Sequence, residues 1–84
     1  MLIDVNGVAP AFKDKVIEVI QGISEPYTFT LTDKKGTGPQ SMVFECDSDD
    51  DPKKVATFLK GAIKKSEVGA VMYFQVVPHG QFML

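Results

Sequence analysis

The sequence predicts an α+β domain with a ferredoxin-like βαββαβ arrangement, in which an antiparallel four-stranded sheet carries two helices on one face. Segments that alternate between apolar and polar residues indicate strands, and segments with apolar residues three and four apart indicate helices. They follow one another as strand, helix, strand, strand, helix, strand. Two right-handed crossovers joined by a hairpin then give the strand order 4-1-3-2.

The first half of the chain supplies a strand, a helix and a second strand. Residues 1–5 are apolar and alternating, and an Asn-Gly turn follows them. Residues 10–23 carry one apolar stripe, and Pro10 suits the first position of a helix. Residues 27–32, YTFTLT, place three apolar side chains on one face and three threonines on the other. This pattern is typical of a half-buried strand.

The second half supplies a hairpin and the second crossover. Residues 33–41 contain two glycines and a proline, which indicates the hairpin loop before a strand at 42–46. A second helix is expected over residues 52–65. Residues 69–77, GAVMYFQVV, are expected to form a strand that is apolar on both faces. The tail, residues 78–84, is interpreted either as loose or as a short extra strand.

The composition predicts one globular domain, residues 1–84, since chains rarely divide into domains below about 150 residues. The chain is 44% hydrophobic and 24% charged and has a net charge of −2. All nine basic residues are lysines. The absence of arginine and of net positive charge argues against nucleic acid as a partner.

Other features of the composition favour a cytoplasmic protein without a membrane partner. A single cysteine cannot form an internal disulfide, which fits a reducing compartment. The first residues lack the basic and apolar regions of a signal peptide. No apolar stretch approaches the roughly 20 residues that a membrane helix needs.

The segment ECDSDDDPKK, residues 45–54, is the densest group of candidate metal ligands. In an EF-hand loop counted from Asp47, position 6 would be glycine and position 12 a glutamate, but Pro52 and Phe58 stand there. Asp51 ahead of Pro52 instead has the pattern of a helix N-cap. The segment therefore predicts the start of a helix and no metal site.

Cys46 and His79 are the only cysteine and histidine, so they are the candidates for a nucleophile–base pair. In the predicted sheet one strand separates them, a lateral distance of roughly 9–10 Å. Cys46 also shares a face with apolar residues, and acidic neighbours would raise its pKa. We therefore expect a core cysteine and a turn histidine, and no catalytic residue or cofactor is assigned.

Lysines gather at the end of the predicted fold that lies opposite the acidic segment 47–51. The hairpin contributes Lys34, Lys35 and Gly36, and the end of the second helix contributes Lys64 and Lys65. A glycine-containing loop with lysines near the start of the first helix suits a small anion such as phosphate. The motif lacks the spacing of a P-loop, so an ordinary solvated hairpin remains the alternative.

The last strand is expected to expose an apolar row of Val71, Tyr73 and Val77, because the helices can cover only one of its faces. Exposed apolar patches mark interfaces, and an edge strand is a template for pairing with another chain. Either a second copy of the chain or the tail would cover this row. The sequence thus predicts a non-enzymatic interaction or regulatory domain, a homodimer or a partner of another protein. The alternative is a small domain that binds an anionic ligand.

Overall fold

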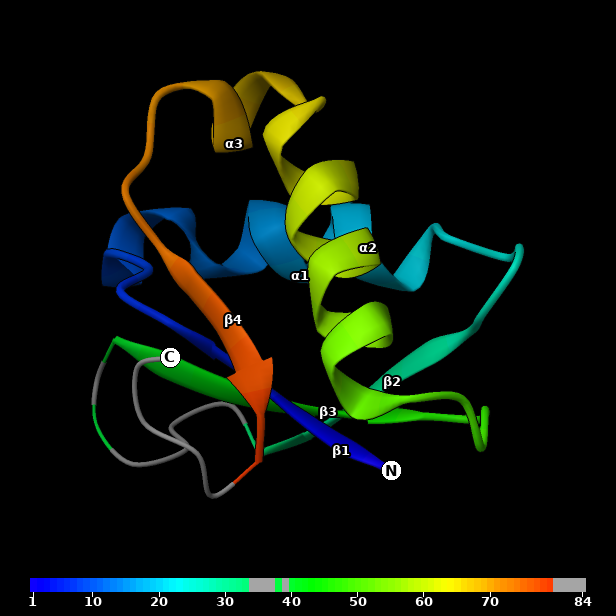
Figure 1. Cartoon of the computed structure of the whole chain (residues 1–84). Helices are drawn as coiled ribbons and strands as arrows, with labels where there is room; N and C mark the ends of the chain where they lie inside the picture. Colours follow the sequence, from blue (N-terminus) through cyan, green and yellow to red (C-terminus); the bar gives the residue numbers. More distant parts are fainter. Residues whose placement is uncertain (34–37, 39, 80–84) are drawn as a thin grey trace.

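The structure is a computed structural model that describes residues 1–33, 38 and 40–79. Within these residues it is an α+β domain with one four-stranded antiparallel sheet and three α-helices (Figure 1). In chain order the elements are β1 (Leu2–Asn6), the 3₁₀ helix η1 (Pro10–Phe12), α1 (Lys13–Gln21), β2 (Phe29–Asp33), β3 (Ser41–Cys46), α2 (Pro52–Lys64), α3 (Glu67–Ala70) and β4 (Gln75–Pro78).

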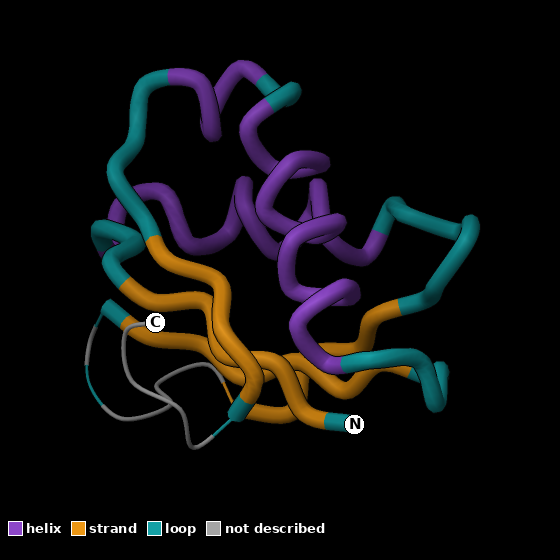
Figure 2. The backbone as a smooth tube through the Cα atoms, viewed as in Figure 1, coloured by secondary structure: helices purple, strands orange, loops and turns teal. Residues whose placement is uncertain are grey.

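The sheet has the strand order β2-β3-β1-β4, with every neighbouring pair antiparallel. In its centre Val5 of β1 lies opposite Met42 of β3 and Val76 of β4. The helices all lie on one side of the sheet, as Figure 2 shows. The expected order and pairing are thus observed, but the third helix and a shortened β4 were not expected, so the predicted layout is confirmed in part.

The core lies between the sheet and the two longer helices. Apolar side chains alternate along the strands and recur every three or four residues along the helices, so that each element buries one face. The side chains without exposed surface come from β1, the loop that follows it, β3 and the two longer helices: Ile3, Val5, Val8, Val16, Ile20, Met42, Phe44, Val55, Leu59 and Ile63.

The predicted strand over residues 69–77 is wrong for its first six residues. The Ser66 hydroxyl accepts a hydrogen bond from the Gly69 amide at 3.1 Å and donates one to the Ile63 carbonyl at 2.6 Å. These bonds turn the chain into the short helix α3 directly after α2. Gly69 packs so closely on α2 that an added Cβ would overlap the Ile63 carbonyl. An apolar run was therefore mistaken for a strand, because its conformation depends on this contact.

Other predicted boundaries need smaller corrections. The helix expected over residues 10–23 begins as a 3₁₀ turn and ends at Gln21. The second strand begins at Phe29 rather than Tyr27, because the Thr28 amide bonds the Asp47 side chain at 3.0 Å. The helix expected over 52–65 ends one residue earlier. Most of the hairpin loop and most of the tail 78–84 lie outside the described residues.

The connection between α3 and β4, residues 71–74, is positioned by the turn after β1. Gly7 has a φ of 84°, in the left-handed region that glycine enters without strain. An added Cβ at Gly7 would lie 3.3 Å from the Tyr73 carbonyl oxygen. Backbone therefore approaches backbone here, and the turn holds the 71–74 connection beside the end of β1.

Candidate functional site

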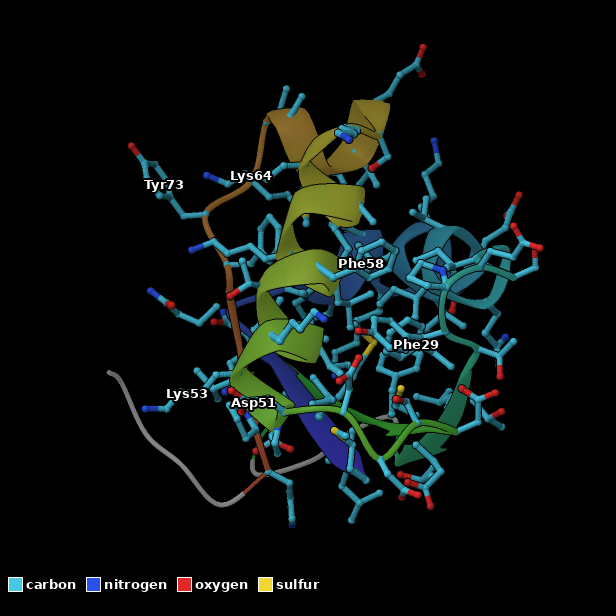
Figure 3. The ribbon with its side chains drawn as sticks, turned by 45° about the vertical axis from the view of Figure 1, so that its right-hand side comes forward. Phe29, Asp51, Lys53, Phe58, Lys64 and Tyr73 are labelled. Atoms are coloured by element: carbon cyan, nitrogen blue, oxygen red, sulfur yellow. The ribbon has the colours of Figure 1, made fainter. Side chains whose placement is uncertain are left out.

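The acidic segment before α2 has a structural role, as predicted. The Asp51 carboxylate accepts a hydrogen bond from the Lys53 amide at 3.1 Å, which caps the helix. The neighbouring Asp50 accepts one from the Tyr27 hydroxyl at 2.8 Å and lies 3.7 Å from the Lys54 ammonium group. Figure 3 shows Asp51 and Lys53 together at the first turn of the helix. The capping prediction is confirmed.

Two carboxylates of this segment have lowered pKa values. The backbone amide of Thr28 lowers the pKa of Asp47, and the Tyr27 hydroxyl followed by Lys54 lowers that of Asp50. In the part of the chain that the structure describes, no group of three or more His, Cys, Asp or Glu residues is placed to hold a metal ion. The segment therefore works as a cap and as an anchor for β2.

Cys46 lies in the core, as predicted, and burial raises the pKa of its thiol. It faces the helices with Phe44, since alternate residues of a strand share a face. His79 bonds Asp4, which projects to the opposite side of the sheet from the buried Ile3 and Val5. The sheet thus separates the thiol from the imidazole.

The pairing of His79 with Asp4 is a feature that the sequence interpretation missed. The Nδ1 atom of His79 lies 2.7 Å from Oδ1 of Asp4, whose side chain is only 9% exposed, while 46% of the histidine side chain is exposed. A carboxylate that fixes an imidazole can orient a base. The alternation of β1 placed Asp4 off the core face, but its partner depended on the register of β4.

A buried lysine was also missed. The Lys13 ammonium group donates a hydrogen bond to the Ser41 carbonyl at 2.9 Å, and the Ser41 hydroxyl donates one to the Asn6 side chain at 2.7 Å. Only 5% of Lys13 is exposed. These bonds join the start of α1 to the ends of β1 and β3, so Lys13 has a structural contact at the lysine-rich end of the fold.

An apolar groove runs between α1 and α3, with a volume of about 480 Å³. Its apolar wall includes the exposed Phe12 and Val71, and charged side chains of both signs lie along it. We call it the α1/α3 groove; its lining residues are Phe12, Lys15, Glu18, Val19, Ser66, Glu67, Val68 and Val71.

The structure places the three predicted interface residues differently. Val71 is 77% exposed and Tyr73 is 99% exposed, both in the connection before β4 rather than in a strand. Figure 3 shows the Tyr73 side chain pointing away from the ribbon. Val77 is only 5% exposed and lies opposite Asp4 in the sheet, so its predicted place in an exposed row is wrong.

A second groove lies on the other side of Val71, between the C-terminal half of α2 and the chain that leads into β4. We call it the lysine groove; its lining residues are Lys60, Lys64, Gly69, Ala70, Val71, Met72, Tyr73, Phe74 and Gln75. Its volume is about 680 Å³. Figure 3 shows Lys64 and Tyr73 extending toward the same side of the molecule.

The predicted anion-binding residues meet this groove only in part. Lys64 lines it, whereas Lys65 does not, and Lys60 was not among the predicted site residues. Lys34, Lys35 and Gly36 lie outside the described residues. Of the predicted anion-binding residues that the structure describes, only Lys64 thus lines the lysine groove, together with Lys60 one helical turn before it.

Comparisons of the chain with protein-family models, with curated proteins and with solved structures found no match. Among the helices that the structure describes, none combines the length and the apolar character needed to cross a membrane. Among the described residues, the two grooves and the exposed side chains beside them are the surfaces best suited to binding another molecule.

Proposed function

We propose that this chain is a non-enzymatic interaction domain that associates with a second copy of itself through the surface around Val71. The observation that supports the proposal most is the exposure of Val71 and Tyr73 next to an apolar groove. Large exposed apolar side chains are scattered singly on most monomers. Of the four in the described part of this chain, three line the two adjoining grooves: Phe12, Val71 and Tyr73.

A second copy suits this surface because the surface carries both a groove and a projecting ring, and charges of both signs, so that each feature on one copy can meet a complementary feature on the other. In a twofold interface the same patch faces itself, so a groove and a projecting side chain near the axis each meet their counterpart. Here the Tyr73 ring of one copy would enter the α1/α3 groove of the other. The groove also carries both Lys15 and Glu67, so opposite charges can face each other across the axis.

Solution mass tests this proposal directly. Native mass spectrometry and sedimentation over a range of concentrations should show a species of twice the 9.2 kDa chain mass. Val71→Lys and Tyr73→Lys should each shift the equilibrium toward the monomer, because both would place a charge in a desolvated interface.

Leu2→Lys is the matched control, since Leu2 is the fourth exposed large apolar residue and lines neither groove. It should leave the association constant unchanged. A wild-type chain that stays monomeric at every concentration would refute self-association. Equal dissociation by Leu2→Lys would place the interface elsewhere.

The second candidate function is binding of a small anionic ligand, and the lysine groove favours it. Lys60 and Lys64 line this groove, and no carboxylate is among its lining residues. In a chain with a net charge of −2, such a region is a local exception. Binding to it should weaken as salt screens the two charges.

We further propose that the fold is ferredoxin-like and that the protein works in the cytoplasm. The strand order and the antiparallel pairs support the first statement, and the single buried cysteine is compatible with the second. Nuclear Overhauser contacts from β1 to both β3 and β4 would test the topology. Cell fractionation would test the location.

A further inference from the structure

Two lysines of α2 face the same groove because of their spacing. Lys60 and Lys64 are four residues apart, so their side chains lie one above the other on one face of the helix, with Cβ atoms about 5–6 Å apart. Both line the lysine groove, whose opposite wall is the chain from Gly69 to Gln75. The groove therefore presents two ammonium groups to one space.

These two charges, on Lys60 and Lys64, form no ion pair with the described residues, whereas Lys54 on the same helix lies 3.7 Å from Asp50. Like charges four residues apart repel each other and destabilise a helix slightly. An anion held between them would remove that repulsion, and a doubly charged anion would suit the pair best.

Recognition in this groove depends on side chains, since several backbone amides of its wall are already bonded. The Gly69 amide bonds the Ser66 hydroxyl, and those of Ala70 and Met72 bond the carbonyls of Ser66 and Gly69. The exposed Gln75 adds a neutral amide donor to the two ammonium groups. Three donors on flexible side chains match the three outer oxygens of a phosphate group.

The size and the apolar part of the groove indicate a ligand larger than a bare ion. A volume of about 680 Å³ lies within the range of about 300–1,000 Å³ that is typical of small-molecule sites. Met72, which is half-buried, and Val71 provide apolar surface beside the lysines. A phosphate alone would leave this surface without a contact.

We infer that the lysine groove binds the phosphate group of a small organic phosphate monoester, with Lys60 and Lys64 on the phosphate and the Val71–Met72 side on the organic part. This inference rests on the second candidate function, anion binding, and names the class of ligand. It does not depend on self-association.

Titrations of ¹⁵N-labelled protein test the inference with three probes at fixed ionic strength and pH 8. Phenyl phosphate carries two charges and a ring, inorganic phosphate has the charge alone, and benzoate has one charge and a ring. At this pH phosphate esters are fully charged, because their second pKa is about 6. Phenyl phosphate should bind tightest and shift the amide signals of residues 60–75.

The probes separate failure of the ligand class from failure of anion binding. If inorganic phosphate binds as tightly as phenyl phosphate, the groove binds anions but the organic monoester is wrong. If benzoate equals phenyl phosphate, the need for two charges is wrong. If none of the three shifts these signals at millimolar concentration, the inference and the second candidate function both fail.

A pair of double variants locates the site. Lys60→Gln with Lys64→Gln should weaken phenyl phosphate binding by at least about tenfold, because each lysine supplies a charge-assisted hydrogen bond. The control, Lys53→Gln with Lys65→Gln, changes the net charge equally at two exposed residues that do not line the groove. It should retain binding within about twofold. Equal loss in both variants would show that overall charge, and not the groove, attracts the ligand.

Discussion

The two ends of α2 use their charged side chains in different ways. At the first turn Asp51 caps the helix, while Asp50 bonds Tyr27 and pairs with Lys54. At the other end Lys60 and Lys64 line a groove and have no ion pair among the described residues. The first end is thus engaged within the fold. Charged groups that form no ion pair among the described residues are available to a ligand, and at the second end two of them, Lys60 and Lys64, share one groove.

The same contrast applies to large apolar side chains. Tyr27 is buried, and its ring meets Phe58 edge-on at 5.3 Å between centroids. Tyr73 is almost fully exposed. One tyrosine therefore stabilises the fold, whereas the ring of the other has almost no contact within it.

The largest change in stability is expected from a substitution of Gly69, which packs α3 against the C-terminal end of α2. Gly69→Ala should lower the free energy of unfolding by about 1–3 kcal/mol, since the added methyl group overlaps the Ile63 carbonyl and the backbone must shift. It should also disorder the wall of the lysine groove. Urea denaturation measures the first effect, and amide signals of residues 69–75 measure the second.

Gly61 is the matched control for that variant. It lies inside α2, where an added Cβ would meet nothing within 4 Å. Gly61→Ala should therefore raise stability by about 0.5–1 kcal/mol through helix propensity. If the two variants have the same effect, the close packing at Gly69 does not hold the two helices together.

Local patterns predicted the elements whose conformation local residues determine. The alternation of YTFTLT gave a strand close to its observed position, and the Asp51-Pro52 pair gave the start of α2. The run GAVMYFQVV misled because it is apolar at every position but two. Its first residues form α3 through the contact of Gly69 with Ile63, which no local pattern reveals.

The candidate sites show the same division. Val71, Tyr73 and Lys64 stood out in the sequence as exposed apolar or basic residues, and all three line the lysine groove. Lys60 joins them only because α3 and the connection after it form the opposite wall. The Asp4–His79 pair likewise required the register of β4 against β1, which is a long-range property.

Removal of the Asp51 cap at the N-terminal end of α2 should have the next largest effect on stability. Asp51→Ala should cost about 1 kcal/mol of stability, because the Lys53 amide would lose its acceptor. Asp51→Asn keeps an oxygen at this position and should retain most of the stability. Chemical denaturation of both variants measures the difference, and equal losses would show that charge, rather than the hydrogen bond, accounts for the effect.

A fall in pH should destabilise the N-terminal end of α2, where Asp47 and Asp50 are bonded, more than the C-terminal end. The lowered pKa values of Asp47 and Asp50 mean that the folded chain binds these two protons less readily than the unfolded chain. Their contribution is complete above the unfolded pKa of about 3.9 and is lost as the pH falls through the lower folded values. The melting temperature should therefore fall less steeply between pH 7 and pH 3 in the double variant Asp47→Asn with Asp50→Asn than in the wild-type chain. An unchanged slope would contradict the assignment.

The smallest effect on stability is expected at the C-terminal end of α2, beside the lysine groove. Whether stability rises or falls there shows whether the fold needs the lysine. Lys60→Gln removes a repulsion with Lys64 and no ion pair known from the described residues, so it should raise the stability of the unliganded protein by about 0.2–0.5 kcal/mol. Lys54→Gln on the same helix should lower stability slightly, because it removes the pairing with Asp50. Urea denaturation at low salt measures both, and the difference should shrink at high salt. A lysine whose removal stabilises the free fold is one that folding does not require, as expected of a residue that serves a ligand. A loss of stability for Lys60→Gln would instead make the two ends of α2 alike.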